Sequence, residues 1–144
     1  MVIIFSPGCR FWWPPFDSGA EVHVKDMLLI YADERAWAQL SEEDRQRIYA
    51  EYRQFGDQLR AAGQFVTGSQ LHPTSAASSV RVRDGKRLVT DGPFAETREQ
   101  LGGYYLVNAA NLDEALALAA RIPSARMGTI EVRPLVESMT PAPA

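Results

Sequence analysis

Cysteine and histidine are nearly absent from this sequence. Cys9 is the only cysteine, and His23 and His72 are the only histidines in 144 residues. One cysteine forms no intramolecular disulfide and builds no thiolate metal cluster within a chain. The two histidines lack the spacing that places two imidazoles on one metal. We therefore expect no metal and no cofactor, and the low cysteine content fits a reducing cytoplasm.

The sequence also lacks an excess of positive charge and any long apolar run. Lys and Arg total 15 against 18 Asp and Glu, and charges of both signs are interleaved along the chain. Nucleic-acid backbones are bound by dense basic surfaces. The apolar start "MVIIF" is far too short to cross a membrane. We expect a soluble cytoplasmic protein that has neither nucleic acid nor a membrane as partner.

The length fits one domain, and the pattern divides it into three parts. Residues 1–26 mix prolines, glycines and aromatics without a period, and we interpret them as an N-terminal extension, disordered or due to an upstream start codon. In the alternative, they form an apolar arm for a partner through Phe11, Trp12, Trp13 and Phe16. Residues 27–135 form the domain, and residues 136–144 a flexible tail.

Regular patterns begin at Met27. "MLLIYA" (27–32) predicts an interior strand, and "GGYYLVNA" (102–109) predicts another apolar strand. "QFVTGSQL" (64–71) and "GTIEVRPL" (128–135) predict two more strands, and "SSVRVRDGKRLVT" (78–90) predicts a hairpin that turns at Asp84-Gly85. Ser41 and Asn111 are predicted to cap two helices. Their buried stripes are predicted to be Ile48, Tyr52, Phe55 and Leu59 in the first, and Leu112, Ala115, Leu116 and Ala119 in the second. This order predicts an α+β ferredoxin-like sandwich with a mainly antiparallel sheet and two helices on one face.

Four stretches carry a resemblance to a known family: "LLIYADE", "SVRVRDGK", "VTDGPFAETREQLGGYYL" and "ARIPSARMGTIEVRP". They resemble the YCII-related family, in the branch with the Asp-Gly-Pro-Phe (DGPF) signature. The resemblance implies a ferredoxin-like fold that dimerises through its sheets, as in dimeric α/β barrels, and no established activity. Members of this branch are often encoded beside extracytoplasmic-function sigma factors, so one hypothesis is a non-enzymatic regulatory or interaction module.

Another branch of that family carries a candidate catalytic pair, a His on the first helix and an Asp near the end of the second. The matching positions here are Tyr52 and Ile122. An unperturbed tyrosine, with a pKa of about 10, shuttles protons poorly at neutral pH. The resemblance therefore does not extend to this mechanism, and Tyr52 is expected either to pack in the core with a satisfied hydroxyl or to contact a ligand.

Alternating residues in "SVRVR" and "TIEVR" suggest a binding face. If Val80, Val82, Ile130 and Val132 face the helices, then Arg81, Arg83, Glu131 and Arg133 share the opposite face. In a homodimer that face would line a cavity in which guanidinium groups hold a small carboxylate or phosphate. The alternative is that these arginines pair with Glu131, Asp91 and Glu96 or are solvated. A small cytoplasmic dimer that binds an acidic small molecule in this cavity is the leading hypothesis.

The stretch "TDGPFAET" admits two interpretations. Asp91 could act as a general base, with Phe94 as an apolar wall and Tyr104 as a hydroxyl donor. Alternatively, it is a structural turn in which Asp91 bonds to the backbone, Gly92 adopts an unusual conformation and Phe94 anchors the loop. His72 is the one residue of the domain whose unperturbed pKa suits proton transfer. A lyase or hydrolase using Asp91 and His72 is therefore the remaining hypothesis.

Overall fold

The computed structural model describes residues 25–136. The predictions for residues 1–24 and for residues 137–144 lie outside the described residues. Between residues 25 and 136, no helix has the length and apolar character needed to cross a membrane. The first strand begins at Lys25, two residues before the predicted boundary at Met27.

Four strands form one antiparallel sheet. They are β1 (Lys25–Ala32), β2 (Phe65–Gln70), β5 (Gln100–Asn108) and β6 (Thr129–Pro134), and they lie in the order β2-β5-β1-β6. The apolar run 27–32, predicted to be an interior strand, lies in the central strand β1; the apolar run 102–109 falls largely in the other central strand, β5. Strand order and direction agree with the predicted ferredoxin-like α+β fold.

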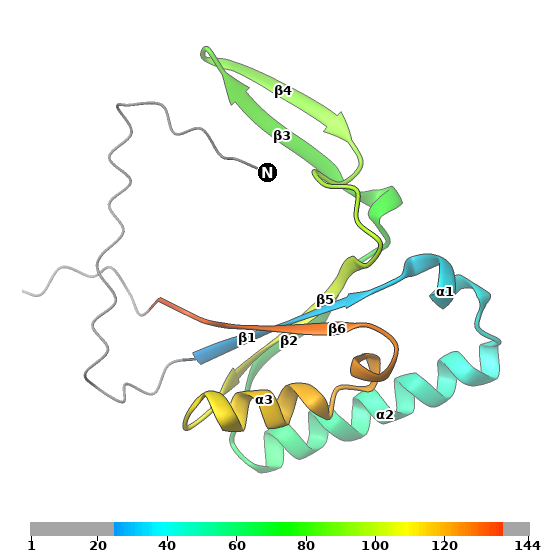
Figure 1. Cartoon of the computed structure of the whole chain (residues 1–144), viewed down its shortest axis with the longest axis vertical. Coiled ribbons are helices and arrows are strands. Elements are labelled where there is room, and N and C mark those ends of the chain that lie inside the picture. The colour runs from blue at the N-terminus through cyan, green and yellow to red at the C-terminus, as the bar shows by residue number, and fades with distance from the viewer. Residues whose placement is uncertain (1–24, 137–144) are drawn as a thin grey trace, which may run out of the picture.

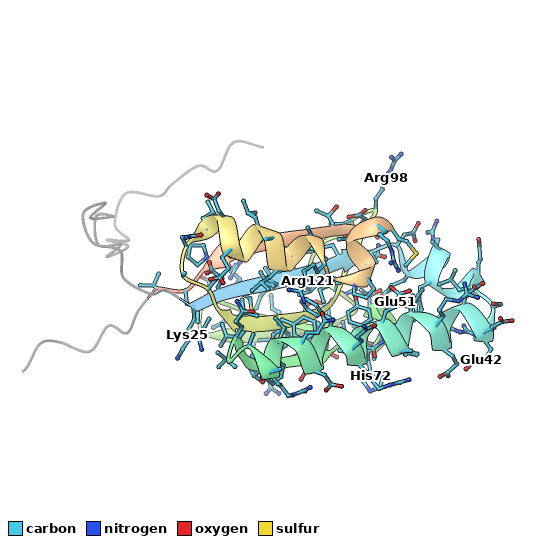
Figure 2. All side chains as sticks on the ribbon, turned by 90° about the horizontal axis from the view of Figure 1, so that it is seen from below. Lys25, Glu42, Glu51, His72, Arg98 and Arg121 are labelled. Carbon is cyan, nitrogen blue, oxygen red and sulfur yellow. The ribbon has the colours of Figure 1, made fainter. Side chains whose placement is uncertain are left out.

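Two helices, α2 (Glu42–Ala61) and α3 (Leu112–Ala120), lie side by side on one face of the sheet (Figures 1 and 2). Both predicted caps are confirmed: the Ser41 hydroxyl accepts a hydrogen bond from the Asp44 amide, and the side-chain carbonyl of Asn111 accepts one from the Glu114 amide. The six-residue α1 (Glu34–Gln39) was not predicted, since it is too short to show a helical period.

The core lies between this sheet face and the two helices. Its buried residues are Leu28, Ile30, Phe55, Leu59, Val107, Leu118, Ala119 and Ile122. The predicted stripe of α2 is confirmed, with Tyr52 at its partly buried edge. The predicted stripe of α3 was partly wrong: Leu112 and Leu116 are exposed, and Leu118 is buried instead. This helix is apolar on most sides, so its sequence does not select one face.

The two remaining strands, β3 (Ser78–Arg83) and β4 (Lys86–Asp91), form a separate two-stranded sheet, called the hairpin below. The predicted turn is confirmed, with positive φ angles of 51° at Asp84 and 72° at Gly85. The hairpin stands on the side of the main sheet away from α2 and α3 (Figure 1). Val80 and Val82 therefore do not face the helices, as expected from the alternation, but are each 60% exposed.

Candidate functional site

The face of the main sheet opposite the helices has an apolar centre. In β1, Leu28 and Ile30 point to the core, so the half-buried Met27 and Leu29 between them point the other way. Their neighbours in β5 are Leu106 and Tyr104, and their neighbours in β6 are Arg133 and Glu131. We call these six residues the open face, because none of the described helices covers it (Figure 1).

The hairpin also presents apolar side chains to solvent. Val80 pairs directly with Val89, and Val82 is two residues along the same face, while Leu88 pairs with Arg81 on the other face. All four aliphatic side chains are at least half exposed. A lone two-stranded hairpin is at best marginally stable in water. These side chains are therefore suited to burial against a partner.

Positive charge is concentrated on the hairpin. Residues 78–91 contain Arg81, Arg83, Lys86 and Arg87 against Asp84 and Asp91, in a chain of net charge −3. Within the described range these basic side chains form no ion pair; Arg83 donates to its neighbour's carbonyl, that of Val82, at 2.9 Å. Arg81 stacks instead over the ring of Phe94, with its guanidinium carbon 4.8 Å from the ring centroid. The three guanidinium groups of the hairpin, those of Arg81, Arg83 and Arg87, thus have no carboxylate partner among the described residues.

Arg133 has a carboxylate partner, Glu131, two residues away on β6. This is the ion pair with Glu131 that the alternative interpretation of these arginines included. For Arg81 and Arg83, no pairing with Glu131, Asp91 or Glu96 occurs in the described part of the chain. Arg133 lies on the open face of the main sheet and the other two arginines lie on the hairpin, so one chain does not bring all three together.

The loop that begins at Asp91 closes the base of the hairpin through its backbone. The Gly92 amide donates to the Ala77 carbonyl at 2.7 Å, and the Ser79 hydroxyl donates to the Gly92 carbonyl at 2.8 Å. Gly92 has the unusual conformation expected of a turn, with φ of 95°. The Asp91 carboxylate makes no hydrogen bond to a described residue, so the backbone bond expected of it is not observed. Phe94 is 76% exposed and anchors nothing in the core.

A second set of contacts holds the hairpin to the body of the protein. The linker turn η1 (Thr74–Ala76) is bound by Glu34, whose carboxylate accepts from both the amide and the hydroxyl of Thr74. The Leu71 amide donates to the Gly102 carbonyl of β5 at 2.8 Å. His72 lies in this linker, exposed, and no hydrogen bond joins it to Asp91. Sequence reasoning missed Glu34, because its partner is 40 residues away.

Tyr52 lies on the opposite side of the main sheet from the open face. Its hydroxyl is 2.6 Å from the hydroxyl of Ser124, a buried residue of the turn η2 (Pro123–Arg126). Burial raises the pKa of Tyr52 above its ordinary value, so the phenol is neutral at pH 7. The interpretation of Tyr52 as a packed residue with a satisfied hydroxyl is confirmed. Ile122, the other position matched to the missing pair, is a core residue.

Two comparisons identify the family. The YCII-related domain matches residues 24–139. The chain is also 40% identical over 110 residues to an uncharacterised protein of Rhizobium meliloti (strain 1021), over 75% of this chain and 89% of that protein. The chain therefore belongs to the YCII-related family. Across residues 25–136, no group of three or more His, Cys, Asp or Glu side chains is arranged to hold a metal ion.

Proposed function

We propose that this protein is a cytoplasmic homodimer of the DGPF branch that binds a small carboxylate or phosphate. The observation that carries the proposal is that the hairpin stands on the same side of the main sheet as the open face (Figure 1), and that the valines of the hairpin are exposed. Two apolar surfaces on one side are self-complementary when a twofold axis relates two copies. Each hairpin would then cover part of the other copy, and the two open faces would enclose the ligand.

The ligand class follows from the charges. Arg81 and Arg83 have no carboxylate partner among the described residues, and a guanidinium group binds a carboxylate or phosphate through two parallel hydrogen bonds. Arg133 and the Tyr104 hydroxyl would contribute from the open face, and Phe94 would form an aromatic wall. We propose binding rather than acid–base catalysis, because no hydrogen bond connects Asp91 with His72 in the described chain.

Sedimentation equilibrium tests the dimer. At micromolar concentration we expect close to twice the chain mass of 16.0 kDa. Val82→Lys should weaken the dimer by at least about tenfold, because a charge would replace buried apolar surface. Leu116→Lys is the matched control, since Leu116 is an exposed leucine of α3 on the other side of the sheet, and it should leave the dimer intact. A monomeric wild-type protein would contradict the proposal.

Calorimetric titration tests the ligand class. We expect phenyl phosphate or succinate to bind the wild type, and Arg81→Gln to weaken binding by at least about tenfold. Arg47→Gln, on the exposed side of α2, is the control that keeps the same change of net charge. A dimer that binds none of a panel of carboxylates and phosphates would favour the regulatory or interaction module instead.

A further inference from the structure

Asp26 is a buried acidic residue on the helix side of the main sheet, away from the open face. It precedes Leu28 and Ile30 on the buried face of β1, and its flanking partners are Val107 of β5 and Pro134 of β6. Only 6% of its surface is exposed. An aspartate is seldom buried to this extent unless it is paired, so its surroundings call for an explanation.

A hollow of about 370 Å³ adjoins Asp26 where β1, β6 and the beginning of α3 meet. Apart from Asp26 and the capping residue Asn111, its walls are apolar, and they are formed by Ala109, Ala110, Leu112, Val132 and Pro134. Small-molecule pockets typically occupy about 300 to 1,000 Å³ and combine apolar walls with a few polar groups. The hollow has the size and lining of a small pocket of this kind.

The Asp26 carboxylate has no hydrogen-bond or ion-pair partner within residues 25–136. Two amides near the start of α3 bind other groups: the Glu114 amide donates to the side-chain carbonyl of Asn111, and the Ala110 amide donates to the Glu114 carboxylate. Burial alone raises the pKa of Asp26 above its ordinary value. No side-chain oxygen or nitrogen in the described part of the chain is both fully buried and without a hydrogen-bond partner, so this carboxylate is only partly desolvated; a cation bound to it would lower the cost of its charge.

An anion is excluded from this hollow by its chemistry. Asp26 is part of the lining, so its negative charge would repel an anion, and the Glu114 amide in the first turn of α3 is already bound to Asn111. One carboxylate beside apolar walls also does not supply the six or more oxygen ligands that Ca²⁺ prefers. A cation that carries its own hydrocarbon group suits both the charge and the walls.

We propose that the hollow beside Asp26 binds a small organic ammonium ion, with its ammonium group on the Asp26 carboxylate and its hydrocarbon part against Leu112, Val132 and Pro134. This site is independent of the proposed anion site, because it lies on the other face of the sheet. Loss of dimerisation or of anion binding would leave it unaffected.

Amide NMR spectra of the full-length protein, titrated with n-butylammonium chloride, test the site. We expect the amides of Ala109, Ala110 and Leu112 to shift with n-butylammonium and not with n-butanol, which has the same hydrocarbon part without the charge. Asp26→Asn should weaken n-butylammonium binding by at least about tenfold. An equal response to n-butanol, no response to either compound, or unchanged binding by Asp26→Asn would overturn the proposal.

A second pair of variants decides the question if Asp26→Asn does not fold. Leu112→Trp adds bulk at the wall of the hollow, whereas Leu116→Trp makes the same change one turn further along α3, outside the lining. We expect Leu112→Trp to abolish the n-butylammonium shifts and Leu116→Trp to retain them. Equal binding by the two variants would place the ammonium ion elsewhere and overturn the proposal.

Discussion

Thr74 donates both its backbone amide and its hydroxyl to the carboxylate of Glu34, each at 2.7 Å. The Glu34 amide in turn donates to the side-chain carbonyl of Gln100, at the start of β5. These bonds join α1, the linker before the hairpin and the central sheet at one point. The orientation of the hairpin therefore depends on a residue far from it in sequence.

Glu34→Ala should loosen the base of the hairpin. It removes the acceptor of two partly buried hydrogen bonds to a charged group, so we expect a loss of about 1.5 to 3 kcal/mol in the free energy of unfolding. Hydrogen exchange should quicken at the Thr74 amide and in β3 more than in β1. Glu43→Ala, which removes only an exposed ion pair with Arg47, is the control. Equal losses in urea titrations of the two variants would contradict the assignment.

Gly92→Ala and Asp91→Asn separate the two interpretations of the DGPF stretch. Gly92 has a φ of 95°, which a Cβ disfavours, so we expect Gly92→Ala to cost about 1 kcal/mol or more. Asp91→Asn should change the stability by less than about 0.5 kcal/mol, because the carboxylate has no hydrogen-bond partner among the described residues. Gly102→Ala is a control at an ordinary φ, where a Cβ would meet only the Ile30 carbonyl, at 3.9 Å.

If Asp91→Asn instead destabilises the protein by as much as Gly92→Ala, the carboxylate caps the turn after all. If it leaves the stability unchanged but abolishes ligand binding or turnover, Asp91 acts at the site. Denaturant titration and calorimetry on the same preparations distinguish these results.

Tyr52 and Ser124 should be energetically coupled. Their hydroxyls are 2.6 Å apart and tie α2 to the turn after α3. Tyr52→Phe should cost about 1 to 3 kcal/mol, because the buried Ser124 hydroxyl loses its partner. In a double-mutant cycle with Ser124→Ala, a coupling of about 0.5 kcal/mol or more is expected. Strict additivity of the two substitutions would show that the hydrogen bond contributes nothing.

Asp26 should make the stability fall as the pH rises. Burial raises its pKa in the folded protein above the ordinary value of 3.8, so the folded state holds a proton that the unfolded state releases. The stability supplied by the protonated form is present below pH 3.8 and is lost as the pH rises through the higher folded pKa. Asp26→Asn avoids this loss. Its advantage in free energy of unfolding over the wild type should therefore grow from pH 4 to pH 8, as followed by urea titration; a constant difference would contradict the assignment.

Local patterns in the sequence predicted the main sheet and its helices. Two continuous apolar runs identified the strands β1 and β5, the first of them as an interior strand, and Ser41 and Asn111 identified the helix starts. Asp84-Gly85 identified the turn of the hairpin. Each of these features depends on residues that are close together in the chain, so propensity and periodicity are enough to find them.

The candidate sites were decided by contacts between distant segments. Alternation in "SVRVR" separates valines from arginines, but it does not indicate which part of the protein covers either set. In the structure the hairpin is a sheet of its own, separate from the main sheet, and Val80 and Val82 are exposed. The pattern of α3 likewise did not choose between Leu116 and Leu118. Asp26 was assigned to the N-terminal extension, residues 1–26, because the regular apolar pattern begins only at Met27.

From its sequence alone this protein could be recognised as an antiparallel α+β domain, because period and capping are properties of neighbouring residues. Only the tertiary structure decided three other features: the burial of Asp26 beside Pro134, the hydrogen bond between Tyr52 and Ser124, and the hydrogen bond that Glu34 accepts from Thr74. Each of these joins residues 40 or more apart, and only the packing of the helices and strands brings such residues within reach of one another.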